Sequence, residues 1–343
     1  MALLEVKNLH AYFATPRGTV KAVNDVSYSL ESGRTLGIVG ESGSGKSVSA
    51  MSILRLLDGN GSIASGEILF DDGGTVRDLV RVSDAEMQAI RGNRISVIFQ
   101  EPMTSLNPVF TVRRQLSEPF TVHRGMSKKR AAEEALRMLE AVQIPSAAAV
   151  LGRYPHQLSG GMRQRVMIAM ALACQPRILI ADEPTTALDV TVQAEILRLM
   201  KDLQREHGTA IVFITHDLGV IGEVADDVVV MYCGQVVEQS TAQTILKNAR
   251  YSHPYTEGLM LSIPRIGGTG ERPRPIPGAV PHPLALPEGC KFSPRCPYAT
   301  ARCLRAEPPL STVASGQRVR CFYPDKEVRN RAEHRKAVVH SEP

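Results

Sequence analysis

The sequence lacks the long hydrophobic runs, the early targeting signal and the strong charge imbalance that mark several protein classes. No apolar run approaches the ~18 residues of a membrane-spanning helix, and Val166 to Cys174 is among the longest. The first residues, MALLEVKNLH, contain an acid and an amide too early for a secretory signal. The formal net charge of +5, from 40 basic and 35 acidic residues, is too small and too scattered to indicate a nucleic-acid binder. We therefore expect a soluble, untargeted chain.

Proline and cysteine are scarce in the first 250 residues and concentrated in the rest. Fourteen of the 22 prolines and four of the six cysteines follow residue 250. A chain of 343 residues, at ~150 residues per domain, corresponds to about two domains. We predict a large regular domain over residues 1–250 and a smaller C-terminal extension over residues 251–343. Ten prolines between Arg272 and Pro309 exclude a continuous helix there and predict a loop-rich segment.

Short apolar runs alternate with helical patterns through the first domain. The runs are rich in valine and isoleucine and lack the 3.6-residue period, so they predict buried strands. They cover residues 35–39, 95–99, 178–181, 210–215 and 227–232. The alternation predicts a doubly wound α/β core with a partly parallel sheet, after an opening strand at residues 4–10. Residues from about Phe110 to Tyr154 have helical patterns without a strand, and with the next helix they predict a helical subdomain over about 110–170.

Polar residues follow four of these predicted strands at the point where each strand ends. The first strand leads into a glycine-rich loop and the second into Gln100, while the third leads into Asp182 and Glu183 and the fourth into His216. In open α/β sheets, ligands bind outside the carboxyl ends of the strands. We therefore expect the loop, the amide, the carboxylates and the imidazole to form one reaction site.

The glycine-rich loop matches the phosphate-binding pattern GxxxxGK[ST]. It lies between a predicted strand and a predicted helix, as that pattern requires, which disfavours a plain glycine-rich turn. Its backbone amides and the helix N-terminus provide positive potential for phosphate. Lys46 is expected to reach the β- and γ-phosphates, and the Ser47 hydroxyl to bind Mg²⁺. The predicted ATP-binding residues of this loop are Gly40, Ser42, Gly43, Ser44, Gly45, Lys46 and Ser47.

The polar residues after the other strands suit the remaining roles of a nucleotide hydrolase. Asp182 is expected to hold the same Mg²⁺ through its water shell, and Glu183 to act as base for the attacking water. Gln100 is expected to bind Mg²⁺ or the water, and His216 to donate to the γ-phosphate. Taken singly, these residues are equally typical of helix caps, loops or structural histidines. Their occurrence together beside a phosphate-binding loop favours catalysis.

The segment Leu158-Ser-Gly-Gly-Met-Arg-Gln-Arg165 identifies a narrower family. Its serine and glycines open a helix and so predict a second anion-binding helix N-terminus. At this point the chain resembles the ATP-binding subunits of ABC transporters. LSGGMRQR resembles their signature motif, while Gln100, Asp189 in Ala-Leu-Asp and His216 resemble their Q-loop, D-loop and H-loop.

This resemblance implies a P-loop NTPase cassette, with a RecA-like core, an antiparallel β subdomain and a helical insertion. In the family two subunits stack head to tail, and each ATP lies between the P-loop of one and the signature of the other. Lys46 and Ser159 therefore serve different nucleotides, and the residues implied at the dimer interface are Ser159, Gly160, Gly161, Gln164 and Asp189. An aromatic side chain is expected to stack on adenine. Phe13 is our choice, with Tyr12 and simple core packing as alternatives.

A closer resemblance, to the dipeptide and oligopeptide importer subfamily, comes from residues 101–108 (EPMTSLNP), His216-Asp-Leu-Gly-Val-Ile221 and His253-Pro-Tyr-Thr256. It covers essentially residues 3 to 324 and implies an ATPase motor subunit of a bacterial importer for peptides or related small solutes. The implied partners are a second homologous ATP-binding subunit, two permease subunits and an extracytoplasmic solute-binding protein, at the cytoplasmic face of the inner membrane. In such importers a groove beside the Q-loop and the helical insertion receives a coupling helix of the permease.

The extension contains four cysteines, Cys290, Cys296, Cys303 and Cys321, in the spacing C-x5-C-x6-C-x17-C. Sets of four thiolates bind zinc or iron–sulfur clusters, and disulfides are disfavoured without a secretory signal. The tail resembles that of importer subunits, some of which carry a four-iron–four-sulfur cluster. We predict such a cluster, with zinc or unmetallated thiols as alternatives. Lys291, Arg295, Arg302 and Arg305 either offset its charge or form a solvated face, whereas Cys174 and Cys233 are expected to be buried apolar residues.

One function of a different class competes with the importer. A soluble ABC-type ATPase acting on nucleic acid or ribosomes would share the same motifs. Such proteins usually join two cassettes in one chain or insert long coiled coils, and this sequence has neither. We therefore expect no nucleic-acid partner.

Overall fold

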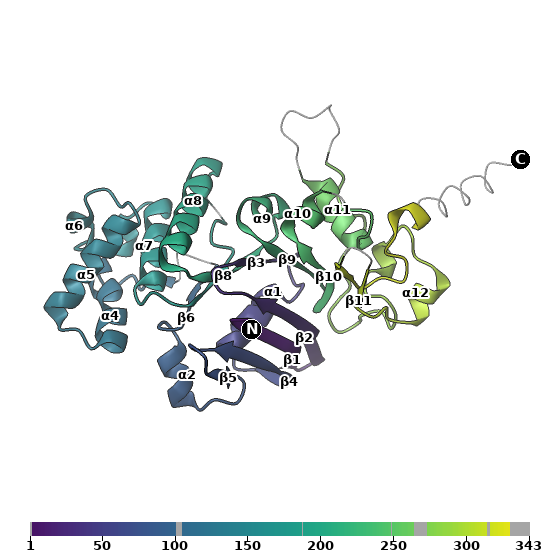
Figure 1. The fold of residues 1–343 in the computed structure, drawn as a ribbon, viewed down its shortest axis with the longest axis horizontal. Helices are drawn as coiled ribbons and strands as arrows, with labels where there is room; N and C mark the ends of the chain where they lie inside the picture. The colour runs from purple at the N-terminus through teal and green to yellow at the C-terminus, as the bar shows by residue number, and fades with distance from the viewer. Residues whose placement is uncertain are drawn as a thin grey trace, which may run out of the picture. The chain divides into compact units, whose positions relative to one another are not determined.

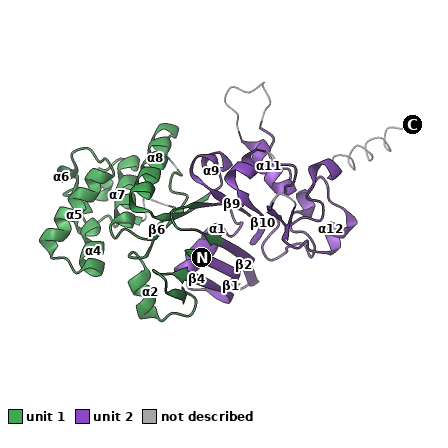
Figure 2. Cartoon of the chain, in the orientation of Figure 1, with its two compact units in different colours: residues 1–4, 29–35, 69–214 green, residues 5–28, 36–68, 215–343 purple. Residues whose placement is uncertain are grey.

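The computed structural model describes residues 2–100, 105–186, 188–247, 249–263, 273–313 and 316–329. Four residues of the peptide-importer motif, 101–104, lie outside this range, as do residue 187 of the Ala-Leu-Asp segment and residues 264–272. The chain divides into two compact units, shown in Figure 2. Unit 1 contains residues 1–4, 29–35 and 69–214, and unit 2 contains residues 5–28, 36–68 and 215–343. Strands that this division cuts are described with the unit that holds most of their residues.

Unit 1 contains a parallel sheet and the helical insertion. Strand β7 (Ile178–Asp182) pairs in parallel with both β6 (Ile95–Ile98) and β8 (Ala210–Thr215). All residues of β7 and β8 are buried, which explains their continuous apolar sequence. The remaining elements are β5 (Val76–Asp78), α2 (Asp84–Ile90), α4 (Val112–Arg124), α5 (Lys128–Ala141), α6 (Ala147–Val150), the 3-10 helix η1 (Pro155–Gln157), α7 (Gly160–Leu172) and α8 (Val190–His207).

The insertion is a group of helices between β6 and β7, as the sequence predicts (Figure 1). Helices α4, α5 and α7 pack on one another around Phe120, Ala131 and Ala173, with Met126 and Met138 against this cluster. Each long helix begins at a side-chain cap, for example Ser127 in α5, whose hydroxyl accepts from the amide of Arg130. Capping and an apolar stripe together explain why the residues of α4 and α5 form helices.

Unit 2 contains two sheets. Strands β1 (Leu4–Thr15), β2 (Gly18–Leu30) and β4 (Gly61–Asp71) form one sheet in the order β2-β1-β4. In the other sheet, β3 (Thr35–Val39) pairs in parallel with β9 (Asp227–Tyr232). The remaining pairings are antiparallel: β9 with β10 (Gln235–Thr241), β10 with β12 (Arg318–Val319), and β12 with β11 (Ser311–Thr312). The helices are α1 (Lys46–Ile53), α9 (Leu218–Val224), α10 (Ala242–Leu246), α11 (Pro254–Ser262), η2 (Ser293–Arg295) and α12 (Ala301–Arg305). The predicted α/β class is confirmed.

In the C-terminal extension (residues 251–343), the residues that the structure describes are mostly irregular between short elements, as the prolines predict. It nevertheless packs on the strands of unit 2. Tyr232 of β9 contacts Tyr255 of α11 and Phe292, with ring centroids 4.6 and 5.3 Å apart. Ion pairs of a buried arginine add to this packing: Arg320 pairs with Asp25 and Glu307. The predicted domain boundary at residue 250 remains a prediction, because the two compact units divide the chain elsewhere.

Within the described part of the chain, no helix has both the length and the apolar character needed to cross a bilayer. Cys174 and Cys233 are 1% and 7% exposed, which confirms that they are buried.

Candidate functional site

The glycine-rich loop leads directly from β3 into α1, as the sequence predicts. Gly40, Gly43 and Gly45 all have positive φ values, and Gly45 caps α1 in the left-handed conformation without a side-chain hydrogen bond. A Cβ at Gly45 would lie 2.2 Å from the carbonyl oxygen of Ala22, and one at Gly40 would lie 2.2 Å from that of Met231. Only glycine fits at these two positions, because other residues would be strained and would also clash.

Lys46 and Ser44 place buried polar groups inside this loop. The Lys46 ammonium donates to the carbonyl oxygens of Gly40 at 2.7 Å and Glu41 at 3.1 Å. The Ser44 hydroxyl is buried and has no hydrogen-bond partner among the described residues. A buried cation and an unpartnered hydroxyl in a loop of left-handed glycines are the donors that a phosphate group requires. The loop therefore fits a nucleotide phosphate chain.

The two aromatic candidates for adenine stacking have different surroundings in unit 2. The Tyr12 hydroxyl donates to Asn24 Oδ1 at 3.1 Å and lies 3.0 Å from His10 Nδ1. Phe13 is half-buried, and its ring lies over Gly61, where a Cβ would be only 2.6 Å away. The polar network around Tyr12 favours Phe13, whose stacking role remains a prediction.

In unit 1, the predicted catalytic residues Gln100 and Glu183 are in contact. The Gln100 amide donates to Glu183 Oε2 at 3.1 Å, and the Thr186 hydroxyl donates to the same oxygen at 3.0 Å. Glu183 has a φ of 46°, a rare backbone conformation for a side chain of this size, and its N–H donates to Ile214 at 3.0 Å. Asp182, the last residue of β7, is 5% exposed. The strained backbone and the two donors fix the direction of the Glu183 carboxylate.

The LSGG segment opens α7, also in unit 1. Ser159 is exposed and caps this helix, its hydroxyl accepting from the Met162 amide at 3.3 Å. Gly160 is exposed too, and Gly161 follows it at the first turn. Gln164 is only 1% exposed, and neither its amide nitrogen nor its oxygen has a partner among the described residues. The Gln164 side chain therefore points inward. Its predicted role at a dimer interface remains a prediction.

Asp189 and His216 both lie at the start of helices. Asp189 is exposed and caps α8, its carboxylate accepting from the Val192 amide at 2.9 Å. His216 is exposed directly after β8, and the next residue, Asp217, caps α9. Unit 1 thus holds Gln100, Asp182, Glu183, Asp189 and the LSGG segment, while unit 2 holds Phe13, the glycine-rich loop and His216.

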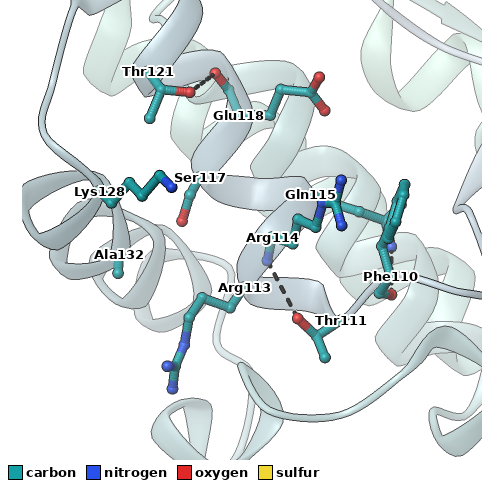
Figure 3. A pocket seen from close by; sticks show the side chains of 10 residues that line it. All are labelled: Phe110, Thr111, Arg113, Arg114, Gln115, Ser117, Glu118, Thr121, Lys128 and Ala132. Carbon is teal, nitrogen blue, oxygen red and sulfur yellow. Dashed lines mark hydrogen bonds between the residues drawn. The ribbon is translucent and has the colours of Figure 1, made fainter.

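Helices α4 and α5 enclose a groove of about 720 Å³ in unit 1 (Figure 3). Its basic residues are Arg113, Arg114 and Lys128, and its one acidic residue is Glu118. The Arg114 guanidinium lies 3.6 Å from the centre of the Phe110 ring. This α4–α5 groove therefore combines an aromatic surface with an excess of positive charge. The sequence patterns do not locate it, because it depends on how two helices pack.

The structure corrects the prediction of a metal centre at the four cysteines of the extension. They line one small cavity of about 20 Å³, which has room for roughly one water molecule. All four are free, and burial raises the pKa of Cys290 to about 11 and that of Cys296 to about 12. The described residues include no group of three or more His, Cys, Asp or Glu that could hold a metal ion. The predicted iron–sulfur cluster is contradicted, and zinc, its alternative, has no support.

Arg295, between Cys290 and Cys296, also differs from its predicted role. Its side chain is 3% exposed and forms an ion pair with Glu41 of the glycine-rich loop, with an Nη1–Oε2 distance of 2.6 Å. It is therefore neither a solvated residue nor a counter-charge for a cluster. Lys291 is likewise engaged, with Glu307 at 3.1 Å. Sequence spacing could not reveal the contact with Glu41, because the two residues are 254 positions apart.

Known proteins share both parts of this chain. The family model described as ABC transporter matches residues 23–186, and the model described as oligopeptide/dipeptide transporter, C-terminal region, matches residues 237–303. The oligopeptide transport ATP-binding protein OppD of Haemophilus influenzae is 52% identical over 320 residues, which are 93% of this chain and 97% of that protein. The oligopeptide transport ATP-binding protein AppD of Bacillus subtilis is 50% identical over 326 residues, 95% of this chain and 98% of its own length.

Solved structures share the fold. A dimeric ATP-binding cassette in a post-hydrolysis state, bound to ADP and phosphate, is 30% identical with a TM-score of 0.62, covering 70% of this chain and 98% of that chain. CbiO1 from Clostridium perfringens, part of an ABC transporter complex, is 27% identical with a TM-score of 0.60, covering 72% of this chain and 91% of its own. The predicted P-loop NTPase cassette fold is confirmed.

Proposed function

Because the chain belongs to the ATP-binding proteins of oligopeptide and dipeptide ABC transporters, we propose that it is the ATP-hydrolysing motor subunit of an importer for peptides or related small solutes. The observation that carries this proposal is the 52% identity to an oligopeptide transport ATP-binding protein across 93% of the chain. Proteins of this family hydrolyse ATP, and the glycine-rich loop of this chain fits the phosphate chain of that substrate.

The P-loop holds the phosphates of ATP. The amides of the loop, from Gly40 to Gly45, and the N-terminus of α1 face the anion, and Lys46 neutralises the β- and γ-phosphates. ATP hydrolysis of this kind uses Mg²⁺, and the oxygen donors that would hold it are the Ser47 hydroxyl, the Gln100 amide and the Asp182 carboxylate. The ion would supply charge neutralisation on the phosphates.

Glu183 is the base of the reaction. Its carboxylate takes a proton from the water whose oxygen attacks the γ-phosphorus in line, and the bond to the β–γ bridging oxygen breaks to give ADP and phosphate. The hydrogen bonds from Gln100 and Thr186 hold this carboxylate in one orientation. His216 donates to the γ-phosphate and stabilises the charge that develops there.

A second cassette completes the site. The signature residues Ser159, Gly160 and Gly161, with Asp189, contact the nucleotide or the P-loop of a partner subunit, whereas Gln164 supports them from inside unit 1. The exposure of Ser159, Gly160 and Asp189 supports this arrangement, and a relative with 30% identity is dimeric with ADP and phosphate bound. We propose that the partner is a second, related ATP-binding chain.

The remaining partners are two permease subunits and an extracytoplasmic solute-binding protein. The α4–α5 groove, with its aromatic surface and excess of basic residues, is suited to a cytoplasmic helix of a permease, which would place the chain peripherally at the inner membrane. Residues 1–250 form the cassette in this proposal and residues 251–343 the extension. The alternative, an ABC-type ATPase acting on nucleic acid or ribosomes, is not favoured by the oligopeptide-transporter match at residues 237–303.

The substitution Glu183→Gln tests the catalytic assignment. It keeps the size of the side chain and removes the base, so we expect MgATP to bind as in the wild type while hydrolysis falls by about 100-fold or more. Hydrolysis is measured by phosphate release from the complex with its permeases, and binding by calorimetry. The matched control is Glu206→Gln at the end of α8, which should leave the rate unchanged.

Two results would contradict the proposal. An unaltered hydrolysis rate in the Glu183→Gln variant would remove Glu183 from the mechanism. Failure of the wild-type chain to associate with permeases of a peptide importer, together with recovery on RNA, would favour the alternative function.

A further inference from the structure

Arg295 of the extension is buried against the P-loop. It ends the short 3-10 helix η2, and its guanidinium binds the Glu41 carboxylate through two parallel contacts, Nη1–Oε2 at 2.6 Å and Nη2–Oε1 at 3.0 Å. The Nε atom donates to the Pro277 carbonyl at 3.0 Å. A bidentate pair of this kind fixes direction as well as distance. The hydrogen bond to Glu41 raises the pKa of Arg295 further, so the guanidinium stays charged.

Glu41 links the extension to the polar groups inside the glycine-rich loop by hydrogen bonds. Its side chain is bound by Arg295, and its backbone N–H donates to the Tyr255 hydroxyl of α11 at 2.7 Å. Its carbonyl oxygen, in turn, accepts from the Ser44 amide at 3.2 Å and the Lys46 ammonium at 3.1 Å. Rotation of the Glu41 peptide would therefore move the partners of the phosphate-binding lysine.

Tightly packed aromatic residues surround the contact between the extension and Glu41. Tyr255 packs against Tyr232 and Phe292, with ring centroids 4.6 and 5.5 Å apart, and the Arg295 guanidinium lies 5.9 Å from the Tyr232 ring centre. Tyr255 is fully buried, so its hydroxyl cannot move to another partner without disturbing the aromatic core. Two residues of the extension thus hold Glu41 in place: Arg295 binds its side chain, and Tyr255 accepts from its backbone N–H.

We propose that Arg295 is a positioning residue for ATP binding: through Glu41 it holds the P-loop in the shape that accepts the phosphates. Arg295 itself does not touch the nucleotide in this arrangement. The C-terminal extension is then a part of the nucleotide site and sets its affinity. This inference rests on the proposed role of the P-loop.

The test is nucleotide affinity in the full chain. Arg295→Gln and Glu41→Gln each remove the charge pair, and we expect the dissociation constant for MgATP to rise about tenfold in each, the effect of losing one charged hydrogen bond. The double variant should lose no more than either single variant, because both remove the same contact. Arg295→Lys keeps the charge without the planar fork, and should give a smaller rise.

The matched control is Arg320→Gln. Arg320 is also buried in the extension and ion-paired, to Asp25 at 3.2 Å and Glu307 at 3.3 Å, but no hydrogen bond or ion pair among the described residues joins it to Glu41. We expect it to lower the melting temperature as Arg295→Gln does while leaving MgATP affinity unchanged. Binding is measured by calorimetry well below the melting temperature of every variant, so that loss of folded protein does not imitate weak binding.

Three outcomes decide whether Arg295 positions the P-loop for ATP binding. Affinity that falls in Arg295→Gln and Glu41→Gln but not in Arg320→Gln supports the proposal, and Arg295→Lys replaces Arg295→Gln if the latter does not fold. Equal affinity in all variants, with only the melting temperature lowered, would overturn it by making the pair purely structural. If Lys46→Ala also binds MgATP as the wild type does, the P-loop role itself fails, and this result is distinct from a failure of Arg295 alone.

Discussion

Helices α1 and α7 both begin at a glycine-rich segment, yet they are built differently. Helix α1 is capped by Gly45 in the left-handed conformation and has the buried Lys46 as its first residue. Helix α7 is capped by the Ser159 hydroxyl, and its first two residues are glycines. The basic side chains of α7 are used inside unit 1: Arg163 donates to Pro155 at 2.7 Å, and Arg165 binds Glu195 at 2.8 Å.

The difference indicates how the two helices divide their work. The N-terminus of α1 offers backbone amides and a cation, enough to hold a phosphate chain alone. The N-terminus of α7 offers amides, and its capping hydroxyl already serves its own helix. It therefore suits a nucleotide that another P-loop holds in place. Three comparisons of variants can break or sharpen this distinction.

The largest effect is expected from Lys46→Ala. Loss of the buried ammonium should weaken MgATP binding by about 100-fold or more, since its charged hydrogen bonds to phosphate are lost. Lys129→Ala, at an exposed position in the first turn of α5, removes a lysine near another helix start and should leave affinity unchanged. Calorimetry on the full chain measures both. Equal losses would mean that general positive charge, and not the position of Lys46, drives binding.

Gly45→Ala and Gly160→Ala form the second comparison. At Gly45 the φ is +95° and a Cβ would meet the Ala22 carbonyl at 2.2 Å, so we expect a loss of about 2–3 kcal/mol in the free energy of unfolding. At Gly160 nothing lies within 4 Å, and alanine should be neutral or stabilise the fold by up to about 1 kcal/mol. Denaturant unfolding measures the two values. Similar values would show that the α1 loop can relax.

The smallest effect is expected from Ser159→Ala. Loss of the cap should lower the free energy of unfolding by about 1 kcal/mol, and the assembled complex should hydrolyse ATP about tenfold more slowly. Affinity of the chain's own P-loop should not change. Ser127→Ala removes the equivalent cap of α5 and should lower stability alone. A loss of MgATP affinity in the isolated Ser159→Ala chain would contradict the division of work between the helices.

The parts of the site that the sequence predicts are those in which neighbouring residues set the geometry. Gly40 to Ser47 is one contiguous segment, and its glycines allow few other backbone paths. The strand ends were also predictable, because Asp182 ends the buried strand β7, His216 directly follows the buried strand β8, and Gln100 lies two residues beyond the end of β6. The hydrogen bond between Gln100 and Glu183 follows from the parallel pairing of β6 with β7, which the alternating pattern implies without specifying.

Other features depend on tertiary packing and were not predictable. The helix phase of α7 turns Gln164 inward together with Ile168 and Ala171, although the motif suggests an interface residue. The cysteine spacing gives the number of thiols but not their burial, which raises the pKa of Cys290 and Cys296. The partner of Arg295 comes from the other end of the sequence, and no local pattern pairs an arginine with a distant acid.

The pairing of β12 with β10 also affects how the chain tolerates shortening. Glu238 and Gln239 of β10 lie opposite Val319 and Arg318, and the Arg320 amide donates to Val237 at 2.8 Å. A chain ending near residue 250 would leave this side of β10 as a bare sheet edge, whose free N–H and C=O groups can recruit strands from other molecules. The extension thus protects the protein against edge-to-edge aggregation, and truncated forms should be recovered mainly as aggregates.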